Sequence, residues 1–577
     1  MITITLSDKT GLQASEGAAY VTGWINAEPS GSFQFQLLGI GGTFSAAPTA
    51  QPIAVQATQA WQSTGINVAP AVAPVTITYV GGGWSADPDT NNGQLYDAAG
   101  CPGLNVPTDQ TQYPIVGVPM GGLIGRIGST GSPFFIGRGP YLMPSTFESG
   151  ELQLCINDDL TGAYGAGLTD NSGSVSVAIF NQGVAYCTVS SVPSIALATA
   201  TNGNERLVFA VAPAQPAPLP LYAASPPVST PPPVAPTSAV PAYAVMQYPP
   251  PPYGNQPQPS PAGPFDFFEF GYDAAADVSA VNGFGLNLSF EYSGTSFGVG
   301  PGVSRATIAS AYNAFITNEG TSAAAYGELL TNGALGTTYT PPTVKSEFFA
   351  IADPSDMLIA KQAAGILGDP LATYWDSTLN GFFAVGSYLS IDLSGNGSNV
   401  YNGQCTTQTL NGVSTAAYTL SNGTNTYTFY QPPLGLESAL YVFQQAFSQY
   451  QSGGSAGDAG LLQMNIWEAL CRGVAVAGVS PQQPQSGFST TAWNAYANWY
   501  KAGSTCDYYA KFLHYATVDG KDSRLVNGSS PMFTGSAAYG FSADENPNGA
   551  YSGPNVPSKT ETNVGPGSTI AIVLGPW

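Results

Sequence analysis

The stretch best suited to chemistry covers residues 264–290, where one carboxylate stands in an aromatic run. The letters FDFFEF place Phe265, Phe267 and Phe268 around Glu269. Apolar surroundings disfavour the charged form of a carboxyl group and suit it to act as a general acid. The alternative reading is an acid that keeps the edge of a sheet soluble. The pattern predicts two β-strands and their connection, the second an alternating run over residues 278–288.

The same letters carry a resemblance. FFEFGYD followed by VSAVNGFGLNL resembles the catalytic strands of the glycoside hydrolase family 64 β-1,3-glucanases, relatives of the thaumatin-like proteins. The resemblance implies that Glu269 is one catalytic residue and that Asn282 stands where the family has its catalytic aspartate. The family inverts the anomeric centre, and an amide cannot serve as the base that inversion needs. Asp273, Asp277 and Glu291 are the candidate substitutes, although strand alternation does not guarantee that any of them faces the substrate.

A second set of candidate residues lies on one loop. Asp158, Asp159, Asp170 and Asn171 come between an apolar strand and an alternating strand at residues 175–179. Calcium takes about six to eight oxygen ligands, and oxygen side chains gathered on a loop can supply them. The alternative is an acidic, solvated hairpin loop.

Three segments around this loop resemble another family. GGGW, then GGLIGRIG, then INDD…Y…DNSGSVSV follow the order found in the LecA-type calcium-dependent galactose-binding lectins. The resemblance implies calcium ligands at Asp158, Asp170 and Asn171, with carbonyl ligands near Asp87 and Ala163. It also places Asp158 and Asp170 beside the sugar. The loop is longer than in the family and the family's sugar-contacting histidine has no counterpart, so calcium binding is better supported than galactose specificity.

Aromatic residues outside these motifs are candidate sugar-stacking groups. Tyr272, Trp375, Trp467 and Trp499 either form such subsites or belong to the core. Tyr272 and Trp375 are the two that we predict to bind substrate. The single histidine, His514, leaves no room for a multi-histidine zinc site.

The composition bounds the remaining possibilities. Charged residues make up 8% of the 577 residues, apolar residues make up 43%, and the net charge is −22. These values favour β-rich, turn-rich globular structure. Thirteen Lys and Arg residues are too few for a basic surface that would bind nucleic acid or anionic lipid. No apolar run is long enough to span a membrane. Six cysteines without metal-type spacing allow up to three disulfides.

The elements that must position these residues suggest an interrupted domain. We predict a mainly β chain with an α/β lobe: a thaumatin-like β-sandwich of the family 64 type and a separate lectin-type β-sandwich. The first strands of the glucanase-like domain occupy residues 1–50, the lectin-like unit 52–183, a returning strand 190–210, an uncharged proline-rich spacer 211–264, and the rest of the glucanase-like domain 265–577. Helices are expected at residues 305–318, capped by Ser304, around 436–447, and around 462–470.

Three functions remain open from the sequence. The first is an extracellular β-1,3-glucan hydrolase of bacterial type with a lectin module for attachment to polysaccharide or galactosides. The second is a catalytically inactive glycan-binding protein. The third is a self-assembling surface or filament protein, suggested by low charge and abundant Gly, Ala, Ser, Thr and Pro. Residues 1–20 lack the features of a signal peptide, so secretion implies a non-classical route or a leader already removed.

Overall fold

The computed structural model describes most of the chain. Its described residues are 2–13, 15–27, 34–48, 50, 52–87, 93–197, 205–222, 264–271, 274–280, 283–331, 350–394, 396–443, 450–452, 457–475, 493, 496–534 and 562–577. Asn282, Tyr272 and Asp273 therefore lie outside the described residues, as does most of the proline-rich stretch. The described part is mainly β with a helical lobe, which confirms the predicted fold class.

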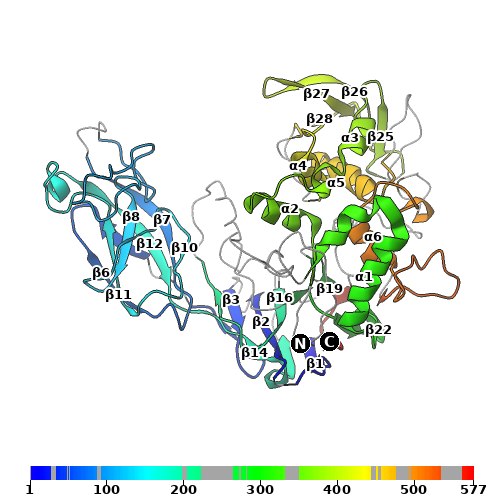
Figure 1. Ribbon diagram of the computed structural model, residues 1–577, viewed down its shortest axis with the longest axis horizontal. Helices are drawn as coiled ribbons and strands as arrows, with labels where there is room; N and C mark the ends of the chain where they lie inside the picture. Colours follow the sequence, from blue (N-terminus) through cyan, green and yellow to red (C-terminus); the bar gives the residue numbers. More distant parts are fainter. Residues whose placement is uncertain are drawn as a thin grey trace.

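Residues 52–180, called here the 52–180 unit, pack around a hydrophobic core of their own. Two four-stranded sheets face each other, in the orders β10-β7-β12-β5 and β6-β11-β8-β9. Their strands are β5 Pro52–Gln56, β6 Gln62–Val68, β7 Thr76–Ser85, β8 Leu123–Ile127, β9 Phe134–Phe135, β10 Tyr141–Leu142, β11 Gly150–Ile156 and β12 Ser172–Phe180. Alternating apolar residues such as Leu152, Leu154, Val175 and Val177 are fully buried between the sheets. Figure 1 shows this unit at the left.

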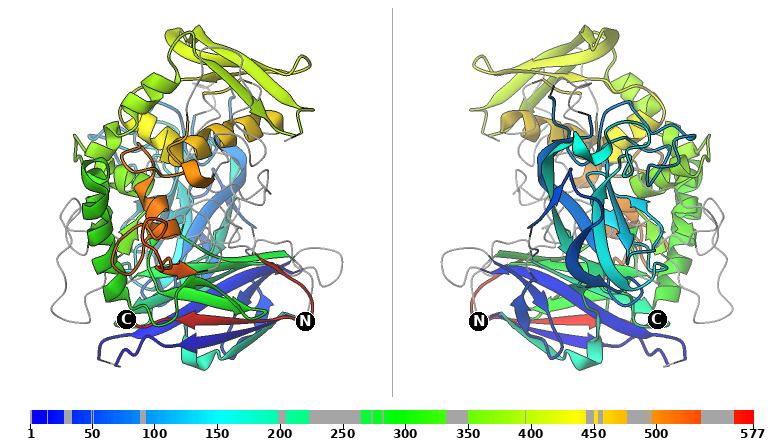
Figure 2. Two further views of the ribbon diagram at one scale, coloured as in Figure 1. Left: turned by 90° about the vertical axis from the view of Figure 1, so that its right-hand side faces the viewer. Right: turned by 90° about the vertical axis from the view of Figure 1, so that its left-hand side faces the viewer.

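The second body contains two larger sheets built from distant parts of the chain. One has the order β15-β1-β31-β21-β22-β29, and the other runs β30-β19-β18-β16-β2-β3-β4, with β14 also paired to β2. Figure 2 shows both at the base of the molecule. The strands are β1 Ile2–Asp8, β2 Ala18–Ala27, β3 Gln34–Leu38, β4 Phe44–Ala46, β14 Cys187–Thr188, β15 Ser194–Leu197, β16 Glu205–Ala212, β18 Phe265–Phe270, β19 Ala274–Ser279, β21 Leu288–Tyr292, β22 Thr295–Val299, β29 Phe533–Thr534, β30 Thr562–Val564 and β31 Thr569–Leu574.

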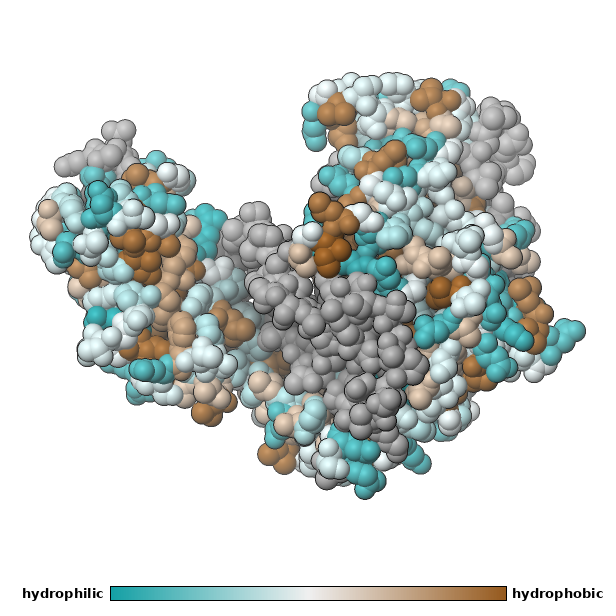
Figure 3. Space-filling view, viewed as in Figure 1, coloured by the Kyte–Doolittle hydropathy of each residue, from teal (hydrophilic) through white to brown (hydrophobic). Residues whose placement is uncertain are grey.

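Strand pairing explains why the chain leaves this body and comes back. β1 pairs in parallel with β31, close to the C-terminus, and β2 pairs antiparallel with β16. Both sheets would therefore lose a central strand without the first 27 residues. The 52–180 unit lies between β4 and β14 along the chain, and Figure 3 shows the surface hollowed between this unit and the helical lobe.

The helical lobe stands above the eight-stranded sheet in Figure 1. Its helices are α1 Arg305–Glu319, α2 Pro354–Ala363, α3 Asp376–Phe382, α4 Leu436–Phe443, α5 Asp458–Cys471 and α6 Tyr508–Tyr515, with a sheet of β25 Tyr388–Asp392, β26 Val400–Leu410, β27 Val413–Ser421 and β28 Thr426–Tyr430. Two small sheets complete the list. β13 Gly183–Val184 pairs with β17 Leu219–Pro220, and β24 Ala350–Ala352 lies between β20 Gly283–Phe284 and β23 Leu330–Thr331.

Local sequence explains the helix boundaries. The predicted cap is confirmed, because the Ser304 hydroxyl accepts the Thr307 amide at 3.1 Å at the start of α1. α2 and α6 begin behind Asp353 and Asp507, whose carboxylates accept the first free amides of each helix. No helix in the described ranges is long and apolar enough to cross a membrane.

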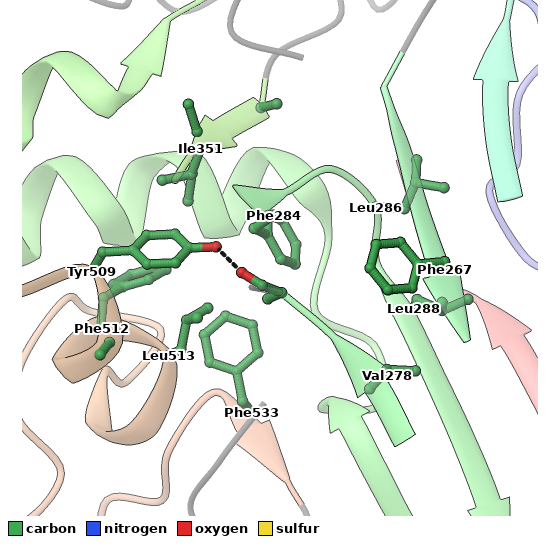
Figure 4. Close-up of a cluster of buried hydrophobic side chains, with 14 of the residues drawn as sticks. Phe267, Val278, Phe284, Leu286, Leu288, Ile351, Tyr509, Phe512, Leu513 and Phe533 are labelled. Atoms are coloured by element: carbon green, nitrogen blue, oxygen red, sulfur yellow. Dashed lines mark hydrogen bonds between the residues drawn. The ribbon is translucent and has the colours of Figure 1, made fainter. Parts of the chain in front are cut away.

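The helical lobe is fastened to the eight-stranded sheet at one end of β19. Figure 4 shows the Tyr509 hydroxyl of α6 donating a 2.6 Å hydrogen bond to the carbonyl oxygen of Ala280. Phe284 and Phe533 make an edge-to-face contact beside this bond, with ring centroids 5.9 Å apart. The end of β19 is thus held by the helical lobe.

The described cysteines do not form the disulfides that the sequence allows. Cys101, Cys155, Cys187, Cys405 and Cys506 are free thiols, and all but Cys101 are buried. Burial raises the pKa of Cys155 and Cys405 to about 11 and that of Cys506 to about 12. These groups are therefore core residues in the thiol form at neutral pH.

Candidate active site and candidate calcium site

The eight-stranded sheet places three charged residues side by side. Arg206 on β16 is directly opposite Glu269 on β18, and Glu269 is directly opposite Asp277 on β19. Trp24 on β2 is opposite Arg206. Because opposed residues on paired strands lie on the same face of a sheet, these four side chains form one row across four strands.

Glu269 is held by an ion pair. Its Oε1 accepts a hydrogen bond from Arg206 Nε at 2.6 Å and lies 2.5 Å from Arg206 Nη2. The guanidinium carbon also lies 5.3 Å from the ring centre of Phe267. About a quarter of the Glu269 side chain is exposed, 26%. The structure therefore differs from the expectation of a carboxyl group enclosed by phenylalanines.

Asp277 is the acid that the register brings to Glu269. Its side chain is 3% exposed, in contrast to the partly open Glu269. The predicted second strand began at residue 278, but β19 begins at Ala274 and ends at Ser279. The tighter hairpin makes Asp277, not a later residue, the partner of Glu269. Glu291 is excluded as a substitute because it is exposed on β21 of the other large sheet.

Asp266 is a further carboxylate on β18, on the face opposite Glu269, and it was missed in the sequence. Burial raises its pKa to about 8, against the hydrogen bonds that it accepts from the amides of Gly285, Leu286 and Phe267. It is 1% exposed and ties the 283–287 segment to β18. Its role is structural, because backbone amides of the protein occupy its oxygens.

The structure contradicts the predicted sugar-stacking role of Trp375. Trp375 is fully buried beside Tyr374 and Phe443, so it cannot present a face to a sugar. Trp467 and Trp499 are 2% and 3% exposed and also belong to the core. The signal that separates core from subsite was absent from the sequence, since both kinds of tryptophan stand in apolar runs. Tyr272 lies outside the described residues.

The acidic loop of the 52–180 unit brings Asp158, Asp170 and Asn171 together. Asn171 Nδ2 donates to Asp158 Oδ2 at 2.8 Å and to the carbonyl of Ala57 at 3.0 Å. Asp158 is 3% exposed and Asn171 is 6% exposed. Burial raises the pKa of Asp158 to about 6, with further contributions from the charges of Asp170 and Asp159.

Asp159 has a different task from its neighbour. Its carboxylate accepts the amides of Thr161 at 2.9 Å, Gly162 at 3.0 Å and Tyr164 at 2.6 Å. Burial works against ionisation, but these amides outweigh it and hold the pKa of Asp159 below its usual range. Asp159 therefore shapes the loop that carries Ala163, which is exposed, and it leaves Asp158 to face the site.

The oxygen atoms at this loop fit a hard cation. Asp170 Oδ1 and Asn171 Oδ1 are buried and have no hydrogen-bond partner among the described residues. Buried polar oxygens without partners are rare and call for a ligand or an ion. Three His, Cys, Asp or Glu side chains do not converge as a complete metal cage anywhere in the described residues. Amide and carbonyl oxygens would have to complete the coordination, as calcium allows.

Asp87 lies on the same side of the unit. It lines a small pocket with Trp84, Tyr96, Cys101 and Leu104. Burial is the main cause that raises the pKa of Tyr113, and the charges of Asp158, Asp159 and Asp87 raise it further. Asp158, Asp170 and Asn171 are thus close to one another, and Asp87 is near them.

Comparisons with known proteins give the following result. No known protein family matches the chain, and no curated protein matches it either. Among solved structures, the β-1,3-glucanase domain (GH64) from Clostridium beijerinckii is similar with a TM-score of 0.46 at 12% identity, over 100% of this chain and 98% of that chain. The GH family 64 laminaripentaose-producing β-1,3-glucanase from Paenibacillus barengoltzii is similar with a TM-score of 0.34 at 12% identity, over 100% of this chain and 75% of that chain, both alone and complexed with laminarihexaose.

Proposed function

We propose that the protein hydrolyses a polysaccharide of the β-1,3-glucan type, with Glu269 and Asp277 as the catalytic pair. The observation that carries the proposal is their direct opposition on β18 and β19. Glycoside hydrolysis needs two carboxyl groups that flank the scissile bond, one as acid and one as base or nucleophile. The resemblance of FFEFGYD and VSAVNGFGLNL to family 64 strands supplies the substrate class. Asn282 then needs no catalytic role.

The environments of the two acids suit different roles. Glu269 is about a quarter exposed and is held by Arg206, so we assign it as the base that removes a proton from water. Asp277 is buried, and we assign it as the acid that donates a proton to the glycosidic oxygen. Arg206 and Asp277 lie opposite Glu269 on its two neighbouring strands.

The test is release of reducing sugar from laminarin by the wild type and by three variants. Glu269→Gln and Asp277→Asn should each remove activity, whereas Asn282→Asp should leave it within about twofold, since a role in proton transfer is worth roughly 10²–10⁴-fold. Absence of activity in the wild type at high protein concentration would contradict the proposed hydrolase function and favour a glycan-binding protein. Activity of the wild type that persists in Asp277→Asn would support a hydrolase but exclude Glu269 and Asp277 as its catalytic pair.

We also propose that the 52–180 unit binds calcium and, through it, a saccharide such as a galactoside. The support is the buried Asp158 beside two oxygens, on Asp170 and Asn171, that have no partner among the described residues. Bound calcium would supply a Lewis-acidic centre for vicinal sugar hydroxyls. Asp158, Asp170 and Asn171 would hold it, and Asp87 and the carbonyl of Ala163 are the further candidates. Calorimetric titration of the metal-free protein with Ca²⁺ tests this unit independently of hydrolysis.

A protein that attaches to polysaccharide and cuts it works outside the cell, and we propose that location. The self-assembling alternative, suggested by low charge and abundant Gly, Ala, Ser, Thr and Pro, stays a prediction. Sedimentation at high concentration distinguishes a monomer from a filament.

A further inference from the structure

A loop that neither proposed activity uses lies against the acidic site of the 52–180 unit. Residues 104–120, called here the 104–120 loop, form a narrow hairpin. The Val106 amide donates a 2.9 Å hydrogen bond to the Val118 carbonyl, and the Met120 amide donates one of 2.9 Å to the Leu104 carbonyl. The loop carries Tyr113 close to its tip. Because both ends of the hairpin are hydrogen-bonded to each other, the position of Tyr113 is set by where the loop is anchored.

The anchor is Asn157, the residue directly before Asp158. Asn157 is fully buried and its amide group exchanges two hydrogen bonds with Ile115, at 2.9 Å to the carbonyl and 3.1 Å from the amide. Its backbone also bonds Gly121 and Gly122 at 2.9 Å and 2.8 Å. The loop is thus fixed to the end of β11, one residue from the acidic site, and Tyr113 is two residues from the anchored position.

Tyr113 meets the acidic site with its hydroxyl and a second tyrosine with its ring. The Tyr113 hydroxyl is hydrogen-bonded to the Asp158 carboxylate and lies close to the charge of Asp159. The ring stacks on Tyr164, with centroids 6.2 Å apart and planes 21° from parallel. Tyr164 is itself held by Asp159 through its amide and by the carbonyl of Asp109 through its hydroxyl, and it is 46% exposed.

We propose that Tyr113 and Tyr164 form an aromatic wall that contacts the C–H face of a pyranoside bound at the acidic site. The inference rests on the proposed calcium-dependent sugar binding. A pyranose offers hydroxyls on one side and an apolar C–H face on another, so a site with oxygen ligands beside a rigid aromatic surface matches both. Tyr164 has the exposed area that such contact requires, and Tyr113 backs it from the anchored loop. Both rings are preorganised, which lowers the entropy lost on binding.

The experiment separates ring from hydroxyl and sugar from metal. Calorimetry gives the affinity of wild type, Tyr164→Ala, Tyr164→Phe and Tyr113→Phe for Ca²⁺ alone, and then, in saturating Ca²⁺, for methyl β-galactoside, methyl α-galactoside and methyl β-glucoside. Stacking on one aromatic ring is worth about 0.5–1.5 kcal/mol, so Tyr164→Ala should weaken binding of the preferred glycoside roughly 2- to 10-fold with Ca²⁺ affinity unchanged. The two Phe variants keep their rings and should bind like the wild type. Exposed Val72→Ala, in the same unit, is the matched control.

Each result bears on one claim. Absence of Ca²⁺ binding in the wild type would contradict both the proposed metal site and the aromatic wall that depends on it. Ca²⁺ binding without affinity for any of the three glycosides overturns the wall and leaves the metal site. Equal or tighter glycoside binding by Tyr164→Ala also overturns the wall, and tighter binding by Tyr113→Phe shows that the Tyr113 hydroxyl blocks the site. Because Tyr164 is nearly half exposed, its replacement should not unfold the unit, and circular dichroism confirms this.

Discussion

Glu269 and Asp277 occupy directly opposed positions on β18 and β19, and they differ in access to water: Glu269 is 26% exposed and Asp277 is 3% exposed. Two carboxylates in this relation normally repel each other and weaken a sheet. Arg206 on the far side of Glu269 compensates for that repulsion. The proposed catalytic pair would use this arrangement for proton transfer.

Replacing Asp277 by Asn should remove the donor to the leaving oxygen. The expected loss in kcat on laminarin is roughly 10²–10⁴-fold. Exposed Glu291→Gln, on the other large sheet, should leave kcat unchanged and serves as the control. Retained binding of laminarin in affinity electrophoresis would show that the variant still folds. An equal loss in both variants would point to a general effect of charge and against this assignment.

Replacing Arg206 by Gln should misplace the Glu269 side chain and leave Asp277 unchanged. Loss of the ion pair to Oε1 removes the contact that holds Glu269 in position, so kcat on laminarin should fall. Arg206→Lys restores the charge but not the paired geometry and should give an intermediate kcat. A kcat equal to that of the wild type in both variants would show that Arg206 does not position Glu269 for catalysis.

The sequence predicted the sheets well where alternation was clear. Ile2, Ile4 and Leu6 alternate with polar residues in β1, and the apolar residues of β11 and β12 are buried as predicted. Ser304 identified the start of α1 because capping is a local interaction. Such features depend on neighbours in the sequence, and the sequence is enough to find them.

The pairing of acids could not be predicted in the same way. The partner of Glu269 depends on where the hairpin between β18 and β19 turns, and a shift of one residue moves every side chain to the other face. Nor could composition show that Arg206, more than 60 residues earlier, contacts Glu269. The burial of Trp375 could not be predicted either, because it results from the packing of the helical lobe around its ring.

Calcium should stabilise the 52–180 unit. A ligand that binds only the folded state at about 100 times its Kd adds about 2.7 kcal/mol, so the melting temperature should rise with added Ca²⁺ and fall with a chelator. Asn171→Ala removes an oxygen and the hydrogen bond to Asp158, and it should abolish the response. Asp109→Asn, an exposed acid on the neighbouring loop, is the control and should respond like the wild type. An unchanged response in Asn171→Ala would locate the metal elsewhere.

Tyr509→Phe should loosen the attachment of the helical lobe to β19. The change removes the donor to the Ala280 carbonyl, which is fully buried, and an unsatisfied buried acceptor costs about 1–3 kcal/mol. Denaturant unfolding measures the loss. Tyr292→Phe removes a weaker 3.3 Å contact with Ser568 at a partly exposed site and should cost less. Equal losses would mean that the bond seen in Figure 4 contributes nothing particular.

Asp507 should make the stability of the helical lobe depend on pH. Burial and the neighbouring Asp353 raise the pKa of Asp507 to about 7, and burial raises that of Asp353 to about 6. In the unfolded chain both titrate near 3.8. Between these limits the native state holds more protons than the unfolded state, so the free energy of unfolding falls as pH rises from about 4 to about 7.

The variant that isolates this effect is Asp507→Asn. The amide can still accept the Tyr509 and Ala510 amides at the start of α6, and it carries no charge to bury. One titrating group changes the free energy of unfolding by at most about 1.4 kcal/mol per pH unit. The variant should therefore gain stability relative to the wild type as pH rises from 4 to 7, as measured by denaturant unfolding at each pH. A constant difference across this range would show that Asp507 is ionised in the native state, and would require a cation beside it.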